Sequence, residues 1–309
     1  MKKTALIFAG QGAQVVGMGK DLVETFPTAK NWMEKASAAL GYDLGSICFS
    51  GPEVELVRTE NAQPGIFLVS WIALQLLREK VPAVEYEAVA GLSLGEFTAL
   101  TAAGYMTFEE GIKLVRQRGR FMQEACDVTK GSMAAIIGLD EALTREVCAE
   151  AGVALANLNC PGQLVISGEA ASINQACELA KARGARKALP LPVAGAYHSP
   201  LMASAQSKLE AELSLLNPGE LDVPVISNVT ARPHEESAVK ERLIEQITNS
   251  VRWEDSMRYL LEQGFTRFIE LGPGTALSGF MKRINKDAQL LNISDLASLE
   301  TTTKALQND

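Results

Sequence analysis

Short apolar runs alternate with longer amphipathic segments along most of this 309-residue chain. A short apolar run is typical of a buried strand, and an apolar stripe at helical spacing is typical of a helix that faces a core. The runs predict strands over 4–9, 88–90, 133–138, 153–158, 163–167, 186–191, 223–228, 267–271 and 289–293. The amphipathic segments predict helices over 30–40, 65–79, 94–103, 108–125, 141–151, 171–183, 200–215, 237–249, 253–263, 275–284 and 296–306. This alternation predicts an α/β fold with a mostly parallel sheet.

The middle of the chain follows a different order of elements. Between Thr129 and Val193 the predicted order is strand, helix, strand, strand, helix, strand. This order is the ferredoxin-like α+β pattern. We therefore predict a ferredoxin-like small domain over 129–194, inserted into a large α/β domain formed by 1–128 and 195–309.

Composition narrows the possible partners and the compartment. The net charge of −8 argues against nucleic acid or an anionic membrane as the main partner. No apolar stretch approaches the roughly 20 residues of a membrane span, and the run after Lys2-Lys3 is too short for a signal peptide. The five cysteines are scattered and form no C-x-x-C pair: Cys48, Cys126, Cys148, Cys160 and Cys177. This pattern predicts reduced thiols in a cytoplasmic protein, with no disulfide framework and no zinc site.

The segment Gly91-Leu92-Ser93-Leu94-Gly95 places a serine between two glycines, where a predicted strand meets a predicted helix. Strand, G-x-S-x-G turn and helix together form a nucleophile elbow. Because the two glycines lack Cβ, the backbone can turn sharply and a neighbouring segment can pack close. The Ser93 hydroxyl would then stand clear of the sheet, at the positive end of the helix.

The same residues also allow a purely structural interpretation. Ser93-Leu94-Gly95-Glu96 matches S-x-x-E, a capping box in which serine and glutamate bond to the free N–H groups of a helix start. Gly95 favours the elbow, because glycine inside a helix costs about 0.5–1 kcal/mol relative to alanine. A cap alone does not require that cost.

A serine hydroxyl is a weak nucleophile until a neighbouring base takes its proton, and the chain has only two histidines. His234 lies in a polar, turn-rich segment and is interpreted as a solvated loop residue. His198 lies on a loop just before a predicted helix that Ser199 can cap. His198 is therefore the candidate general base, with a structural role as the alternative.

Arg118 lies on the apolar stripe of the predicted helix 108–125. A guanidinium is always charged and is rarely buried without a partner. One interpretation is a structural ion pair with an acid from elsewhere in the fold. The other is a bidentate clamp for a substrate carboxylate, which would select a dicarboxylic half-thioester or half-ester.

Gln11 lies in Gly10-Gln11-Gly12, directly after the first predicted strand. A dinucleotide-binding fingerprint would need a third glycine at position 15, where the chain has Val15. A glutamine at the carboxyl end of a strand can instead aim its amide at a site. Together with the Leu94 backbone N–H, it could form an oxyanion hole.

Five motifs, taken together and in order, make the chain resemble the malonyl-CoA:acyl carrier protein transacylases of bacterial fatty-acid synthesis. The resemblance covers essentially the whole chain and implies a hydrolase-like α/β body with an inserted ferredoxin-like domain. The motifs are Phe8-Ala9-Gly10-Gln11-Gly12, Gly91-Leu92-Ser93-Leu94-Gly95-Glu96, Arg118-Gly119-Arg120-Phe121-Met122, Ala196-Tyr197-His198-Ser199-Pro200-Leu201-Met202 and Glu270-Leu271-Gly272-Pro273-Gly274.

The resemblance implies a role for each candidate residue. Ser93 would be the acylated nucleophile and His198 its base, and Arg118 would pair with the free carboxylate of malonyl. Gln11 and the Leu94 N–H would hold the oxyanion.

Two positions depart from the pattern of the relatives. The resemblance implies that the backbone carbonyl of Arg252 orients the histidine, at a position where relatives often have glutamine. Because a carbonyl is invoked, we expect the change to arginine to matter little. Many relatives have histidine immediately before the serine, where this chain has Leu92. We expect that histidine to be dispensable for the chemistry.

The activity implied is ping-pong transfer of malonyl from malonyl-CoA to the phosphopantetheine thiol of an acyl carrier protein, through a malonyl-serine ester. It needs no metal and no cofactor, since the coenzyme A thioester is a substrate. The carrier proteins of this family are acidic, so we expect a basic patch to receive one. The residues Lys181, Arg183, Arg186 and Lys187 form such a patch, unless they are an ordinary solvated charge run.

Three alternative functions remain open at this point. A stand-alone acyltransferase of polyketide synthesis would look almost identical in sequence. A serine thioesterase or esterase would share Ser93 and His198 but would hydrolyse its acyl group. A non-catalytic binding module would form no acyl-serine at all.

Overall fold

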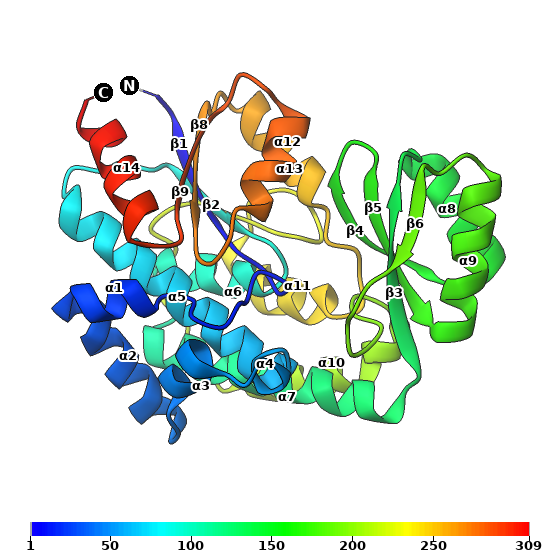
Figure 1. Cartoon of the computed structure of the whole chain (residues 1–309), viewed down its shortest axis with the longest axis horizontal. Helices are drawn as coiled ribbons and strands as arrows, with labels where there is room; N and C mark the ends of the chain where they lie inside the picture. The colour runs from blue at the N-terminus through cyan, green and yellow to red at the C-terminus, as the bar shows by residue number, and fades with distance from the viewer. Residues whose placement is uncertain (1, 309) are drawn as a thin grey trace. The chain divides into compact units, whose positions relative to one another are not determined.

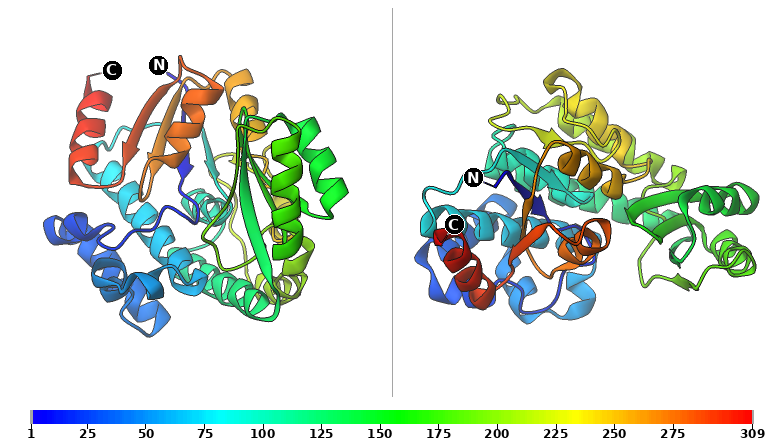
Figure 2. Two further views of the ribbon diagram at one scale, coloured as in Figure 1. Left: turned by 45° about the vertical axis from the view of Figure 1, so that its right-hand side comes forward. Right: turned by 90° about the horizontal axis from the view of Figure 1, so that it is seen from above.

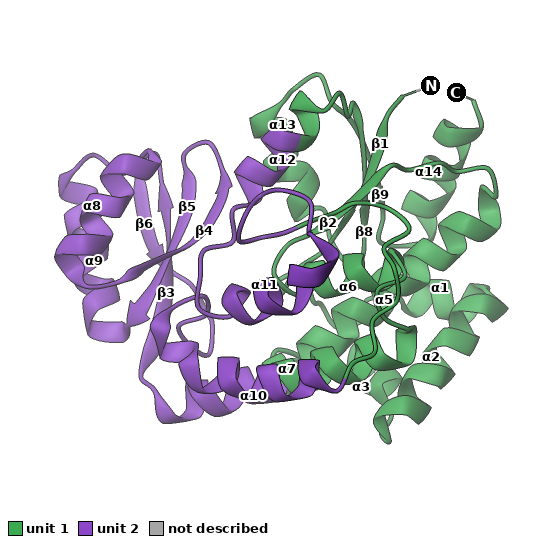
Figure 3. Cartoon of the chain, turned by 180° about the vertical axis from the view of Figure 1, so that it is seen from behind, with its two compact units in different colours: residues 1–119, 216–226, 260–309 green, residues 120–215, 227–259 purple. Residues whose placement is uncertain are grey.

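The computed structural model describes residues 2–308. Contacts within the chain divide these residues into two units (Figure 3). The first unit runs up to residue 119 and also contains 216–226 and the residues from 260 onward, and the second contains 120–215 and 227–259.

The first unit contains a five-stranded parallel sheet (Figure 1). Its strands, in spatial order, are β7 (Val225–Ile226), β2 (Ala88–Gly91), β1 (Thr4–Phe8), β8 (Arg267–Leu271) and β9 (Gln289–Ile293). Every residue of β1, β2, β7 and β8 is buried. Parallel sheets are covered on both faces, which is why β1, β2 and β7 are almost entirely apolar, whereas β8 also carries the buried charged residues Arg267 and Glu270.

The helices of the first unit lie around this sheet. They are α1 (Lys20–Thr25), α2 (Pro27–Leu40), α3 (Leu44–Ser50), α4 (Glu53–Leu56), α5 (Thr59–Lys80), α6 (Leu94–Ala102), α13 (Ala276–Ile284) and α14 (Leu296–Gln307), together with the first part of α7 (Phe108–Val128). Every residue of α6 is buried, because α6 packs against β1, β2 and β7 and also contacts α5. The polar residues of this helix, Glu96, Thr98 and Thr101, are buried with the apolar ones.

The sequence pattern missed α1, α3 and α4, and it began α5 too late. We placed the start of that helix at residue 65, just after Pro64, whereas it begins at Thr59 and continues through the proline. Proline removes one backbone hydrogen bond, and here tertiary packing outweighs that loss. Thr59 is fully buried, and its carbonyl lies so close to Gly119 of α7 that a Cβ there would come within 2.5 Å of it.

The second unit contains a separate four-stranded antiparallel sheet. Its order is β4 (Ala154–Cys160), β5 (Gln163–Glu169), β3 (Gly131–Ile137) and β6 (Lys187–Pro190). The helices α8 (Glu141–Ala151) and α9 (Ala170–Ala182) pack side by side on one face of this sheet (Figure 2). The predicted α/β fold, with a parallel sheet and a second element set of strand, helix, strand, strand, helix, strand, is confirmed.

The second unit contains more of the chain than the predicted inserted domain, 129–194. It also contains η1 (Pro200–Met202), α10 (Ala203–Ser214), η2 (Glu236–Ala238), α11 (Val239–Gln246) and most of α12 (Trp253–Glu262). Backbone contacts explain part of the difference, because Val251 donates to the carbonyl of Ala156 and accepts from the N–H of Leu158 in β4. The segment 227–259 is thereby attached to the edge of the antiparallel sheet.

Glycines allow α6 to approach β1 more closely than any other residue would. A Cβ on Gly95 would lie 2.2 Å from the carbonyl oxygen of Phe8. We predict that Gly95→Ala lowers the free energy of unfolding by on the order of 1–3 kcal/mol or more, because the backbones must separate. Gly279 of α13 is a matched control, since it is exposed and a Cβ there meets nothing within 4 Å.

Gly279→Ala should raise stability by about 0.5–1 kcal/mol, the usual cost of glycine in a helix. Thermal and urea unfolding of the two variants measure both changes. A Gly95→Ala protein as stable as the parent chain would contradict the close approach of α6 to β1.

Candidate active site

Ser93 occupies a strained turn between β2 and α6. Its backbone has φ 52° and ψ −103°, a conformation that residues with a side chain rarely adopt. A Cβ on Gly91 would lie only 1.9 Å from the carbonyl carbon of Gly95, so the turn can close this tightly only with glycine at both positions. The predicted elbow geometry is therefore confirmed.

The Ser93 side chain does not cap the helix that follows it. No hydrogen bond joins its Oγ to the first turn of α6. Instead, Ser93 Oγ accepts a hydrogen bond from Nη2 of Arg118 at 3.0 Å. The capping-box interpretation is wrong, because the turn directs the hydroxyl toward α7 and away from the helix axis.

Arg118 reaches Ser93 from inside the first unit. Its side chain is 1% exposed, and the guanidinium carbon lies 5.1 Å from the centre of the Phe97 ring, a cation–π contact. Nη1 donates to Oε1 of Gln63 at 2.7 Å, and Nη2 donates to Ser93. The structure thus places a buried positive charge directly at the hydroxyl of the elbow serine.

Gln11 and Ser93 both lie just beyond the carboxyl ends of two neighbouring strands of the parallel sheet. Strands β1 and β2 pair in register, and their last residues, Phe8 and Gly91, are partners. The loops that follow are packed tightly, since a Cβ on Gly10 would lie 2.5 Å from the carbonyl oxygen of Leu92. The amide of Gln11 accepts a hydrogen bond at Oε1 from the Thr59 hydroxyl, at 2.8 Å.

Leu94 follows Ser93 directly and is the first residue of α6. The first N–H groups of a helix have no acceptor within that helix. They also lie at its positive end, where negative charge is stabilised. These two properties are what the predicted oxyanion role of Leu94 requires, and that role stays a prediction.

His198 belongs to the second unit and is held by a backbone carbonyl. The side chain is 4% exposed, its φ is 56°, and Nδ1 lies 2.8 Å from the carbonyl oxygen of Gln246. Because a carbonyl can only accept, this hydrogen bond favours the tautomer that carries its proton on Nδ1. Nε2 is then an acceptor, as a general base requires, and its pairing with Ser93 stays a prediction.

The carbonyl that orients His198 was predicted to be that of Arg252, and this prediction is wrong. The Arg252 carbonyl accepts from the N–H and the hydroxyl of Ser256, at 3.0 and 2.9 Å, because Arg252 immediately precedes α12. Gln246 is instead the last residue of α11. The last carbonyls of a helix have no partner within it, so this one is available to the imidazole.

Two further residues of the site were missed from the sequence. Gln63 and Thr59 are both fully buried in the first turns of α5 and connect Arg118 to Gln11 through hydrogen bonds. Our predicted helix began after them, so they appeared to lie in a loop. Their signal is the spacing: a threonine and a glutamine four residues apart lie on one face of a helix.

The fifth sequence motif has a structural role at Glu270. Its carboxylate, 1% exposed, accepts from the backbone N–H of Leu277 at 3.0 Å and of Ser278 at 2.7 Å, at the start of α13. Burial raises the pKa of the Glu270 carboxyl, and the hydrogen bonds from Ser278 and Leu277 oppose that shift. Glu270 is thus occupied as a helix cap.

The cysteines do not compete with Ser93 as nucleophiles. All five are free and buried. Burial raises the pKa of Cys126 and of Cys148 to about 11, and that of Cys48 to about 12, so these thiols stay protonated near neutral pH.

Within residues 2–308 there is neither a cluster of metal-ligating side chains nor a membrane-spanning helix. No three His, Cys, Asp or Glu side chains are grouped so that they could hold a metal ion. No helix in this part of the chain has the length and apolar character that a membrane crossing requires.

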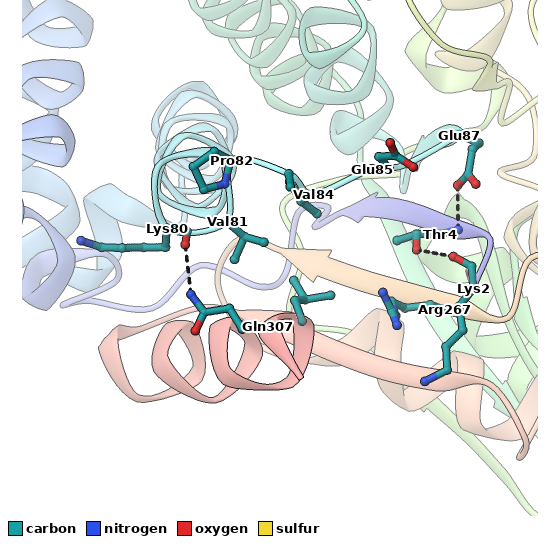
Figure 4. A pocket seen from close by; sticks show the side chains of 12 residues that line it. Lys2, Thr4, Lys80, Val81, Pro82, Val84, Glu85, Glu87, Arg267 and Gln307 are labelled. Carbon is teal, nitrogen blue, oxygen red and sulfur yellow. Dashed lines mark hydrogen bonds between the residues drawn. The ribbon is translucent and has the colours of Figure 1, made fainter. Parts of the chain in front are cut away.

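A cavity of about 640 Å³ lies at the amino-terminal ends of the strands of the parallel sheet, opposite to the ends that precede Gln11 and Ser93 (Figure 4). Its lining includes Thr4 and Arg267, which begin β1 and β8. Several of its polar groups bond to the protein itself: the Thr4 N–H donates to Glu87 at 2.8 Å, and Arg267 Nε donates to Gln289 at 2.9 Å. Ligands of open α/β sheets bind at the carboxyl ends of the strands. Ser93 follows the carboxyl end of β2, whereas this cavity lies at the opposite ends of the strands.

The fold and the serine elbow define a class of α/β proteins that use a serine nucleophile. Within that class, residues 5–305 match the acyl transferase domain family. The chain belongs to this family.

Similarity to known relatives, in sequence and in structure, extends over nearly the full length of the chain. It is 44% identical to the malonyl CoA-acyl carrier protein transacylase of Bacillus subtilis, over 100% of this chain and 99% of the relative. The solved transacylase of the same name from Clostridium perfringens is 39% identical, with a TM-score of 0.94 over 99% of this chain and 98% of that one. A malonyl-transacylase solved in complex with a type II polyketide synthase acyl-carrier protein is 37% identical, with a TM-score of 0.95 over 98% and 99%.

The corrected assignment of the carbonyl predicts that the Arg252 side chain is not needed for acyl transfer. Its Nε–Asp255 contact, at 2.8 Å, is a partly exposed ion pair, which contributes about 0–1 kcal/mol. Arg252→Gln should therefore leave the rate of acyl transfer within about twofold of the parent chain. His198→Ala is the matched comparison and should lose most of the activity, and equal losses in the two variants would contradict the assignment.

Proposed function

We propose that this chain transfers malonyl from malonyl-CoA to the phosphopantetheine thiol of an acyl carrier protein. The observation that carries the proposal is the contact between the buried guanidinium of Arg118 and the hydroxyl of the elbow residue Ser93. A cation at this place suits an acyl group that ends in a carboxylate, and malonyl is such a group. The family and the names of the relatives support the same substrate class.

The first half-reaction forms an acyl-serine. His198 Nε2 takes the Ser93 hydroxyl proton while Oγ forms a bond to the thioester carbonyl carbon. The Gln11 amide and the Leu94 N–H donate to the resulting oxyanion. The C–S bond then breaks, and coenzyme A leaves as a thiol with the proton from His198.

Arg118 has two partners in this reaction in turn. Before substrate binds, Nη2 donates to Ser93 Oγ. The malonyl carboxylate is a stronger acceptor than a neutral hydroxyl, so it draws the guanidinium into a charge-assisted pair. That exchange leaves the lone pairs of Ser93 Oγ available for attack on the thioester.

The second half-reaction reverses the first with a different thiol. The phosphopantetheine thiol gives its proton to His198 and attacks the malonyl-serine ester, and the Ser93 oxygen recovers a proton as it leaves. We infer that no metal or cofactor takes part, because the thioester already supplies an activated acyl group. The buried reduced cysteines support a cytoplasmic location.

We infer a hydrolase-like body, supported by the parallel sheet and the serine elbow after β2. We infer a ferredoxin-like second fold, supported by the antiparallel order β4-β5-β3-β6 with two helices on one face.

The predicted basic patch, a candidate surface for the acyl carrier protein, is partly neutralised by neighbouring acids. Lys181 pairs with Glu178 at 2.8 Å, and Arg183 pairs with Glu150, so acids offset two of the four positive charges. Arg186 and Lys187 are exposed. We infer that these two residues are the part of the patch that receives an acidic carrier.

A stand-alone acyltransferase of polyketide synthesis is the second candidate. It is favoured by the similarity to a transacylase whose solved partner is a type II polyketide synthase carrier. Both candidates use the same chemistry and differ in the carrier. Transfer rates to a fatty-acid carrier and to a polyketide carrier, compared side by side, separate them.

We expect a covalent malonyl adduct on Ser93. Intact mass spectrometry after incubation with malonyl-CoA should show the added malonyl in the parent chain and none in Ser93→Ala. Tryptic peptides locate the modified residue. An adduct that persists in Ser93→Ala would rule out Ser93 as the nucleophile, and a parent chain that forms no adduct would exclude acyl transfer through serine.

We expect Arg118→Ala to change the choice of acyl group. Loss of a charged hydrogen-bonding partner costs about 1.5–3 kcal/mol, or on the order of 10–100-fold in malonyl transfer. Acetyl transfer should be retained or improved, because acetyl has no carboxylate. Arg120→Ala is the matched control, since Arg120 is exposed and pairs with Glu124, and both rates should stay within about twofold.

Equal losses of malonyl and acetyl transfer in Arg118→Ala would instead show that Arg118 only supports the structure. Steady-state rates with malonyl-CoA and acetyl-CoA measure the ratio directly.

A further inference from the structure

An aromatic ring supports the buried guanidinium of Arg118. The guanidinium carbon lies over the ring of Phe97, 5.1 Å from the ring centre, which is within the range of a cation–π contact. Phe97 is 0% exposed and Arg118 is 1% exposed. Because water has little access to this contact, the attraction between the cation and the face of the ring is stronger than it would be at the protein surface.

Arg118 contacts α6 at two places. Nη2 donates to the hydroxyl of Ser93, the residue that precedes the helix, and the guanidinium carbon lies over the ring of Phe97, one turn into it. A third contact comes from α5, where Oε1 of Gln63 accepts from Nη1 at 2.7 Å. The guanidinium is thus held by two hydrogen bonds and by one aromatic ring.

Close packing of α7 on α6 brings the guanidinium to the ring. Gly111 lies about two turns before Arg118 on the same face of α7. A Cβ on Gly111 would lie 2.6 Å from the hydroxyl oxygen of Thr101, and that hydroxyl donates to the carbonyl of Phe97 at 2.8 Å. The faces of the two helices that carry Phe97 and Arg118 are therefore the faces that pack together.

The three contacts of the guanidinium do not change in the same way when an acyl group with a carboxylate binds. In the proposed reaction the carboxylate replaces Ser93 at Nη2, so Gln63 and Phe97 are left to hold the guanidinium. A single hydrogen bond at Nη1 lets the group turn about that bond, and the ring beside it opposes the turn. The ring is neutral, so it does not compete with the carboxylate as a buried acid would.

We propose that Phe97 is a positioning residue that sets the preference for an acyl group with a carboxylate, acting through Arg118. Its ring holds the guanidinium where the carboxylate binds, so less ordering is required when the substrate arrives. The inference rests on the proposed function, in which Arg118 pairs with the malonyl carboxylate. It adds a determinant of acyl choice that acts without any hydrogen bond of its own side chain.

The test changes the electrostatics of the ring and keeps its shape. Phenylalanine analogues with one, two or three fluorine atoms are placed at position 97 by nonsense suppression, because fluorine withdraws electron density from the face of the ring. The measurement is the single-turnover rate of acylation of Ser93, followed by intact mass with malonyl-CoA and separately with acetyl-CoA. The malonyl rate should fall with each fluorine, by about 2–30-fold in total, and the acetyl rate should stay within about twofold.

Phe97→Leu extends the test with an ordinary residue. It removes the ring and should lower the ratio of malonyl to acetyl acylation by about 2–30-fold. Phe268→Leu is the matched control, since Phe268 is 0% exposed in β8 of the same unit, and it should leave the ratio within about twofold. The temperature of unfolding shows whether each variant folds, and the fluorinated series decides the matter if Phe97→Leu does not.

The effect should also depend on the cation. In an Arg118→Ala background, the ring with three fluorine atoms should change malonyl acylation by less than about twofold, because the group that the ring holds is absent.

Three outcomes would overturn the inference. These are a malonyl-to-acetyl ratio that stays constant or rises across the fluorinated series, an equal loss with the two thioesters, and a full effect of fluorination without Arg118. Failure of the proposed function is a different result, in which the parent chain forms no malonyl-serine or Arg118→Ala leaves the ratio unchanged.

Discussion

The approach of α6 to the parallel sheet is the constraint on which the site depends. Gly91 and Gly95 meet where no Cβ fits, and Gly95 lies against the carbonyl of Phe8 in the neighbouring strand. This close packing holds Ser93 at a positive φ, with its hydroxyl turned away from its own helix and toward Arg118. If either glycine were replaced by a residue with a Cβ, the helix would move away from the sheet and Ser93 could relax into an ordinary helix cap.

Arg118 donates to two neutral acceptors, Gln63 and Ser93, and this arrangement suits a clamp for a carboxylate. Its two terminal nitrogens donate to an amide oxygen and a hydroxyl, and an aromatic ring lies beside the guanidinium. Neutral acceptors such as these orient the guanidinium and leave its charge unchanged. A substrate carboxylate therefore gains a charged pair that a neutral acyl group does not. The same cation imposes a hydrogen-bond direction on Gln63, Thr59 and Gln11, so one buried charge organises several neutral groups.

The histidine illustrates how a helix end can replace a carboxylate. The last carbonyl of α11, that of Gln246, takes the Nδ1–H of His198 because the helix offers it no partner of its own. A neutral acceptor holds the imidazole in one tautomer without adding a negative charge beside it. The residue predicted for this task, Arg252, stands at the start of the next helix, where its carbonyl is already used by Ser256.

The sequence alone determined the alternation of strands and helices, the elbow at Ser93 and the unusual position of Arg118. These follow from local patterns: apolar spacing, glycines around a serine, and a charge on an apolar stripe. Only the tertiary structure decided that α5 begins at Thr59, that Gln63 and Thr59 connect Arg118 to Gln11, and that Gln246 holds His198. The physical reason is that each of these depends on a hydrogen bond between segments far apart in the chain, and local preferences carry no information about which distant donor meets which acceptor.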